Sequence, residues 1–175
     1  MPKGIIIPAD QEQPLEQGTV TTLEDVEDVV AGHGEAVDLP DAGATIFVNE
    51  EGLPRKLPFN PRATFLWWLW VPAARQRAML VGDVIVVGVS DRRGEESDIP
   101  DELAASLLSP HGHRVEVQTV GDPKWYGNAA VFPDYFEAAV WGMTLLERWT
   151  LAHTVRVMPL TEQEAAERAT PEEAP

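Results

Sequence analysis

The sequence predicts an α+β fold, with a mixed or mostly antiparallel sheet, about four short helices and a C-terminal strand–helix–strand extension. Three observations predict it. Segments with strand and helix periodicity follow one another too irregularly for a doubly wound fold. Hydrophobic residues make up 44% of the 175 residues, which is enough for a packed core. Residues 83–90 are apolar on both faces and therefore predict a central strand.

Six segments have the pattern of strands, because they are short, rich in β-branched residues and bounded by turn residues. They lie at residues 4–7, 35–39, 45–49, 83–90, 113–120 and 155–160. The second and third flank the sequence Pro-Asp-Ala-Gly at residues 40–43 and predict a hairpin. The polar residues 10–18 predict a loop.

Capping signals and helical spacing of apolar residues predict the helices, at residues 21–32, 61–70, 98–109 and 134–150, with a further turn or two at 73–79. Thr21 and Glu24 have the spacing of a capping box at the start of the first helix. Asn60 and Pro61 suit the cap and first residue of the second. A strand over residues 65–71 is the alternative there, since aromatic residues favour strands.

The same patterns divide the chain into three parts. We expect an α+β base domain at residues 1–109 and a strand–helix–strand extension packed on it at residues 110–160. The acidic residues 161–175 predict a disordered tail.

Composition excludes several classes of function. The chain has no cysteine, which removes disulfides, cysteine-ligated metals and thiol nucleophiles. No apolar run approaches the ~20 residues of a membrane span, and the first residues do not form a signal peptide, so we expect a cytoplasmic protein. The four histidines lack metal-site spacing, and no nucleophile or phosphate-loop motif occurs. We therefore expect no metal, no cofactor, no catalytic residue and no enzymatic activity.

Several short motifs follow one another between residues 3 and 109. They are Ile-Ile-Ile-Pro at 5–8, Leu-Glu-Asp-Val at 23–26 with Gly32, Glu-Ala-Val at 35–37, Asn-Glu-Glu-Gly at 49–52, Leu-Pro-Phe-Asn at 57–60 with Arg62 and Ala63, and residues 82–88. Their order resembles a family known as the domain of unknown function 3846.

Two features depart from the family pattern as we know it. Pro61 separates Asn60 from Arg62, and residues 67–70 (Trp-Trp-Leu-Trp) are more aromatic than expected. The family is met mainly in bacteriophages, plasmids and their bacterial hosts and has no assigned chemistry. The resemblance therefore implies a mobile-element context, with the host cytoplasm as the location if the protein is phage-encoded.

Two groups of large apolar side chains are candidates for binding a partner protein. The helix expected at residues 134–150 has two apolar faces, and a chain of this size has little core to cover both. Tryptophan is also the residue type most enriched in interface hot spots. The candidates are Trp141, Leu145 and Trp149 in that helix, and Trp67, Trp68 and Trp70 in the earlier one. Burial in a core is the alternative, and a second copy of the chain is an alternative partner.

Charge is distributed unevenly. Thirteen bases and 29 acids give a net charge of −16, which argues against binding of nucleic acid or anionic membranes by the protein as a whole. Residues 53–82 are the exception, because they hold five bases and no acid beside several tryptophans: Arg55, Lys56, Arg62, Arg75 and Arg77. Such a segment is typical of sites that hold a nucleotide or single-stranded nucleic acid.

These features leave three hypotheses. The first is a non-catalytic phage-type protein that binds a host protein, as an anti-defence factor or a modulator of a host process. Its acidic surface would steer association with the partner. In the most specific form of this hypothesis the acidic surface mimics the phosphate backbone of DNA. The second is a binder of an anionic ligand through the basic aromatic segment. The third is a homodimeric structural protein.

Overall fold

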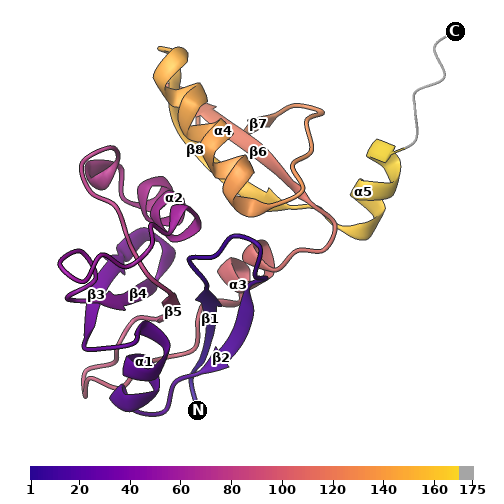
Figure 1. Cartoon of the computed structure of the whole chain (residues 1–175). Coiled ribbons are helices and arrows are strands. Elements are labelled where there is room, and N and C mark those ends of the chain that lie inside the picture. Colours follow the sequence, from indigo (N-terminus) through magenta and orange to yellow (C-terminus); the bar gives the residue numbers. More distant parts are fainter. Residues whose placement is uncertain (170–175) are drawn as a thin grey trace, which may run out of the picture. The chain divides into compact units, whose positions relative to one another are not determined.

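The computed structural model describes residues 1–169 and divides into two compact units (Figure 1). The N-terminal unit comprises Met1–Ala104, and the C-terminal unit begins at Ala105. This division falls inside helix α3 (Asp101–Leu107), somewhat before the boundary predicted at residue 109. The predicted packing of the extension on the base domain stays a prediction.

The N-terminal unit is built on a five-stranded sheet with the order β2-β1-β5-β4-β3, in which every neighbouring pair is antiparallel. Its strands are β1 (Lys3–Ile7), β2 (Glu16–Thr19), β3 (Gly34–Leu39), β4 (Ala44–Asn49) and β5 (Val84–Gly88). Strand β5 is central and every one of its residues is buried, as its sequence predicted. The α+β class and the mostly antiparallel sheet are likewise confirmed.

The hairpin predicted around residues 40–43 is confirmed, because β3 and β4 pair over six consecutive positions. A short 3₁₀ turn, η1 (Pro40–Ala42), connects them, and Gly43 adopts a left-handed φ of 64°. The loop predicted at residues 10–18 was wrong in its second half, where β2 pairs with β1. Strand β2 is an edge strand of polar residues, so no apolar alternation marks it.

Helix α1 (Leu23–Val30) closes one face of this sheet, where Val26 and Val30 pack with Phe47 and Ile85. Its capping box lies one residue beyond the predicted pair of Thr21 and Glu24, because the helix starts at Leu23. The cap is Thr22, whose hydroxyl accepts from the amide of Asp25. The Asp25 carboxylate in turn accepts from the amides of Thr21 and Thr22, and these bonds lower its pKa.

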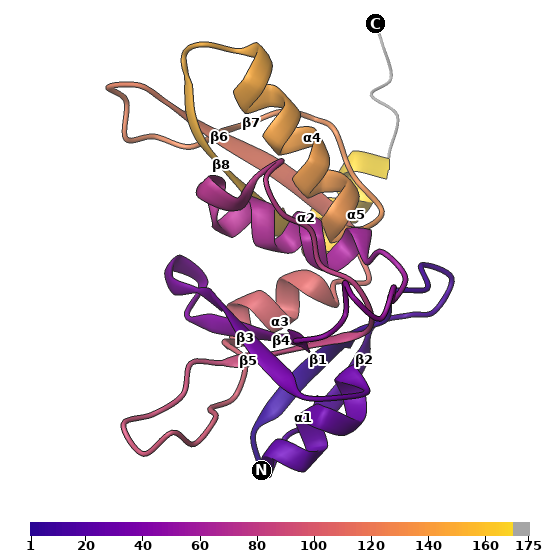
Figure 2. The same ribbon diagram turned by 60° about the vertical axis from the view of Figure 1, so that its left-hand side comes forward.

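Helix α2 (Pro61–Trp70) begins at the predicted cap, Asn60, so the alternative of a strand over residues 65–71 was wrong. It ends in a 3₁₀ turn, η2 (Pro72–Ala74), which is shorter than the helical turns predicted at residues 73–79. Figure 2, turned by 60°, shows α1 and α2 on opposite faces of the five-stranded sheet. This arrangement explains why β4 and β5 are buried throughout.

The C-terminal unit contains a second antiparallel sheet with the order β7-β6-β8. Its strands are β6 (His113–Thr119), β7 (Tyr126–Gly127) and β8 (Ala152–Pro159), and helix α4 (Tyr135–Arg148) packs across β6 and β8. Gly142 lets α4 approach the sheet closely, because a Cβ at this position would lie only 3.2 Å from the Val155 side chain and 3.3 Å from that of Val115. The predicted strand–helix–strand order is confirmed, with β7 as an unpredicted addition.

The opposite face of this small sheet carries a polar network. Glu116 of β6 accepts from Arg156 of β8 at 2.7 Å, and the Arg156 guanidinium stacks 4.2 Å from the ring centre of Trp125. Arg114 reaches Glu164 at 3.1 Å. Glu164 lies in helix α5 (Glu162–Ala169), where the sequence predicted a disordered tail. Residues 170–175 of that predicted tail lie outside the described residues.

An exposed histidine after α1 gives a test of the local electrostatics. Nδ1 of His33 lies 2.8 Å from the Glu27 carboxylate, and this hydrogen bond, with the negative charge of Glu27, raises the pKa of His33 from 6.5. The folded state therefore binds the proton more tightly than the unfolded chain. The stabilising contribution is complete below pH 6.5 and is lost as the pH rises through the raised pKa.

We expect an NMR titration of the His33 ring to have its midpoint above pH 6.5 in the native protein. In Glu27→Gln the midpoint should fall, because the hydrogen bond loses its charged acceptor. Equal midpoints in the two proteins would contradict this account.

Candidate functional site

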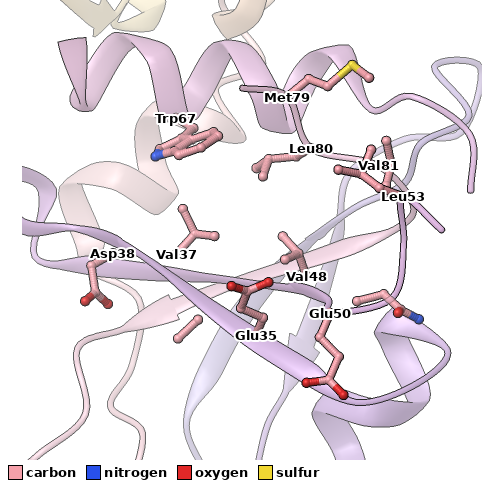
Figure 3. Close-up of a pocket in the computed structure, with 12 residues that line it drawn as sticks. Glu35, Val37, Asp38, Val48, Glu50, Leu53, Trp67, Met79, Leu80 and Val81 are labelled. Carbon is pink, nitrogen blue, oxygen red and sulfur yellow. The ribbon is translucent and has the colours of Figure 1, made fainter. Parts of the chain in front are cut away.

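A pocket of about 460 Å³ lies in the N-terminal unit between the β3–β4 hairpin and helix α2 (Figure 3). Its lining comes from residues 35–38 of β3, residues 48–50 at the end of β4, Leu53, Trp67 of α2, and residues 79–81 before β5. This volume is within the range of small-ligand sites.

The walls of the pocket are mostly apolar. Val37 and Val48 point from the hairpin toward Trp67 and Leu80, as Figure 3 shows. Val48 and Leu80 are buried, whereas Trp67 is half-buried. The pocket therefore presents an indole surface and aliphatic groups to whatever enters it.

Two apolar side chains at the pocket are exposed to solvent. Leu53 is 60% exposed and Met79 is 50% exposed. Exposed apolar side chains beside a concave apolar surface mark sites of contact with other molecules more often than isolated ones do.

Hydrogen bonds fix the wall formed by residues 79–81. The buried hydroxyl of Thr64 accepts from the amide of Leu80 at 2.9 Å. The backbone N–H of Asn60 donates to the Leu80 carbonyl, also at 2.9 Å. The Trp68 indole N–H donates to the carbonyl of Ala78 at 2.8 Å. Helix α2 and its cap thus bond the chain on both sides of Met79, at Ala78 and at Leu80, and fix this wall of the pocket.

The pocket lining is acidic. It contains Glu35, Asp38 and Glu50 and no basic residue. Glu35 lies on the same face of β3 as Val37, because both are odd-numbered residues of one strand. Asp38 lies on the other face, where it accepts from the Thr45 hydroxyl at 3.1 Å. Asp38 and Glu50 point away from α2 in Figure 3, so their charges lie around the pocket rather than inside it.

The structure separates the first group of predicted partner-binding residues. Trp67 lines the pocket, while Trp68 packs edge-on against Phe65 with ring centres 5.9 Å apart. All three tryptophans of α2, including Trp70, are half-buried. Only Trp67 thus contributes to the pocket, and Trp68 serves to hold the chain that follows α2.

The second predicted group lies in the C-terminal unit. The Trp141 ring packs on Phe132 with ring centres 5.5 Å apart, and Trp141 and Leu145 are half-buried. Trp149, which caps the C-terminus of α4, is 39% exposed, and Leu151 beside it is 59% exposed. Both apolar residues therefore lie exposed in the chain that follows α4.

Three of the five basic residues predicted to hold an anion donate to backbone carbonyls instead. Arg55 binds the carbonyl of Ala31 at the end of α1. Arg62 binds the carbonyls of residues 8, 10 and 13, and Arg75 binds the carbonyl of Trp68. Lys56 and Arg77 are exposed. The structure therefore distributes these side chains over several loops and does not gather them into one site.

The sequence analysis missed most of the pocket. The sequence analysis singled out none of Glu35, Val37, Leu53 and Met79, because nothing in a linear pattern brings the β3–β4 hairpin to the segment after α2. Leu53 offered one signal, as a large apolar residue between the acids at 50–51 and the bases at 55–56, whereas Met79 lay at the end of the helical turns predicted at residues 73–79.

The described residues offer no group of three or more histidine, acidic or cysteine side chains that could hold a metal ion. None of the helices described combines the length and apolar character that crossing a membrane requires. The buried His113 bonds through Nε2 to the carbonyl of Ser106 and packs edge-on against Tyr135. Its environment within the C-terminal unit is that of a core histidine.

Comparison with known proteins identifies the family of the chain. The model of the family described as a domain of unknown function (DUF3846) matches residues 2–111, and the chain belongs to this family. The matched residues include the whole pocket. No curated protein and no solved structure matches the chain.

Proposed function

We propose that this DUF3846 protein is a non-catalytic protein that binds a protein of its host cell, and that the pocket receives an apolar part of that partner. The observation that carries the proposal is the pocket itself, with Trp67 in its wall and the exposed Leu53 and Met79 beside it. A tryptophan in the wall of a pocket is typical of a binding hot spot, and exposed apolar neighbours are typical of a surface that contacts a partner.

The charge of the protein supports a protein partner with a basic surface. The chain carries −16, and the pocket lining holds three acids and no base. Such a field attracts a basic partner, accelerates association and makes it sensitive to salt. A DNA-binding protein of the host has a surface of this kind, which is consistent with the mobile-element context of the family. Interference with a host defence or another host process would be the consequence of such binding.

The basic aromatic segment supports the anionic-ligand alternative less well. Arg55, Arg62 and Arg75 are committed to backbone carbonyls at 2.7–3.0 Å, so a phosphate would have to compete with bonds that hold loops in place. The exposed Trp149 and Leu151 give self-association a surface in the C-terminal unit.

A capture experiment from host lysate tests the proposed function. We expect the tagged native protein to retain one dominant partner and the double variant Leu53→Glu/Met79→Glu to lose at least about 90% of it, because two charges then lie beside the apolar wall. The measurement is quantitative mass spectrometry of the bound fraction at low and at raised salt.

A matched control separates the pocket from general charge effects. Leu23 is 63% exposed and Val89 is 49% exposed, so their exposed fractions match those of Leu53 and Met79. Neither residue lines this pocket. Leu23→Glu/Val89→Glu changes the net charge equally and should keep the partner. Loss in both variants, or retention in both, would contradict the role of the pocket. Loss only in Trp149→Ala would move the partner surface to the C-terminal unit.

A further inference from the structure

Strand β3 is the last strand of its sheet, and in the described chain it pairs on one side only, with β4. Its outer edge therefore presents backbone N–H and C=O groups that another extended chain can bind. Peptides that add a strand to such an edge gain affinity from main-chain hydrogen bonds and specificity from alternate side chains.

The edge of β3 lacks most of the devices that prevent strand addition. The strand has the sequence Gly-Glu-Ala-Val-Asp-Leu, with no lysine and no proline, and it pairs with β4 over six positions without a bulge. The other edge strand, β2, has only four residues. Strand β3 is thus the longer and more regular of the two edges.

The pocket lies against this same edge strand. Four consecutive residues of β3, 35–38, line it. Glu35 and Val37 direct their side chains to the pocket side of β3, so the pocket runs along the strand that forms the edge. A strand added there would direct alternate side chains over Val37 and toward Trp67.

The acidic residues of this edge favour a basic segment as the added strand. Glu35 lies on the pocket face of β3 and Asp38 on the opposite face, so an added strand meets an acid on each of its own faces. We propose, building on the function proposed above, that β3 accepts an extended segment of the partner in which apolar residues enter the pocket and basic residues flank them. A second copy of this chain fits poorly, because pairing β3 with itself adds two further acids to an edge that already holds Glu35 and Asp38, and supplies no base.

Synthetic peptides and the full-length protein test the proposal. The probe is the acetylated, amidated peptide Lys-Val-Thr-Leu-Lys-Arg-Thr, compared with a version in which glutamate replaces each basic residue. Binding is measured by calorimetry, and the contact is located by hydrogen exchange of the β3 amides. We expect the basic peptide to bind and to slow exchange in β3, and the acidic peptide not to bind.

Two further comparisons isolate the strand pairing and the charge. In an extended peptide alternate N–H groups point to opposite edges, so one N-methylated form blocks the edge that faces β3 and the complementary form blocks the other edge. Only the form that is blocked on the edge facing β3 should lose binding. Glu35→Lys should weaken the basic peptide by about tenfold or more. Glu16→Lys, the same change on the exposed β2 edge, should leave its affinity nearly unchanged.

Several results would overturn strand addition: no binding of the basic peptide, binding without protection of β3, equal binding of both methylated forms, or a dimer of the protein that occupies the edge. None of them depends on the lysate experiment. If the native protein captures a partner through Leu53 and Met79 while β3 stays unprotected, the proposed function stands and strand addition fails. If no partner is captured, the proposed function fails whatever the peptides show.

Discussion

Replacing Asn60 by alanine is expected to lower the free energy of unfolding of the N-terminal unit by about 3–4 kcal/mol. The side chain is fully buried. Its amide donates to the carbonyls of Ile7 and Gly82, both at 2.9 Å, and its oxygen accepts from the amide of Ala63 at 3.0 Å. Alanine removes the cap of α2 and deprives the carbonyls of Ile7 and Gly82 of the bonds that the Asn60 amide donates.

Urea unfolding followed through the NMR signals of β5 measures this effect in the full chain. Asn128→Ala is the matched control, because Asn128 is exposed and its side-chain oxygen accepts from the neighbouring amide of Ala130. Its cost should stay within about 1 kcal/mol. An equal, small cost for the two variants would refute the structural role assigned to Asn60.

The same substitution should also affect the pocket. The Asn60 side chain joins β1, the start of α2 and Gly82, and it thereby positions the backbone N–H of residue 60, which donates to the Leu80 carbonyl in the pocket wall. We therefore expect Asn60→Ala to weaken partner capture even under conditions in which most of the protein remains folded.

Replacing Gly88 by alanine is expected to cost about 2–4 kcal/mol of unfolding free energy. Gly88 ends β5, and its amide donates to the carbonyl of Ser97 at 2.9 Å. A Cβ at this position would collide with the carbonyl of Asp98 and the hydroxyl of Ser97. Since one of these is backbone, the clash can be relieved only by moving the chain at residues 97–98.

That movement would disturb β1 as well, because Asp98 accepts from the amide of Lys3 and Ile99 donates to the Lys3 carbonyl. Gly127→Ala is the control, since a Cβ there would have its nearest neighbour at an ordinary 3.5 Å and the residue needs no special backbone conformation. We expect a change within about 0.5 kcal/mol for this control. Similar urea midpoints for Gly88→Ala and the native protein would contradict the prediction.

Local physics determined the elements that the sequence analysis predicted well. Asn60 and Pro61 start α2 whatever the rest of the chain does, because the cap and the fixed φ act on neighbouring residues. Strand β5 is apolar on both faces and therefore had to be central. The errors have a local cause too. The capping box lies one residue later than predicted because the acid at its far end is Asp25 rather than Glu24. The Asp25 carboxylate accepts from the amides of Thr21 and Thr22.

Contacts between distant segments decided the rest. The arginines appeared in the sequence as free cations beside tryptophans, yet the fold brings the carbonyl at the end of α1 to Arg55, 24 residues away, and that of residue 8 to Arg62, 54 residues away. No pattern of neighbours carries that information.

The sequence by itself determined the α+β class, the central strand, the capped helices and the strong negative charge of this protein. Only the tertiary structure decided which tryptophan of α2 lines the pocket. Trp67, Trp68 and Trp70 are the same residue type in one short segment, and of the three it is Trp67 that lines the space between the β3–β4 hairpin and the segment at Met79. A pocket is a space left between elements, and its position follows from how those elements pack rather than from any one of them.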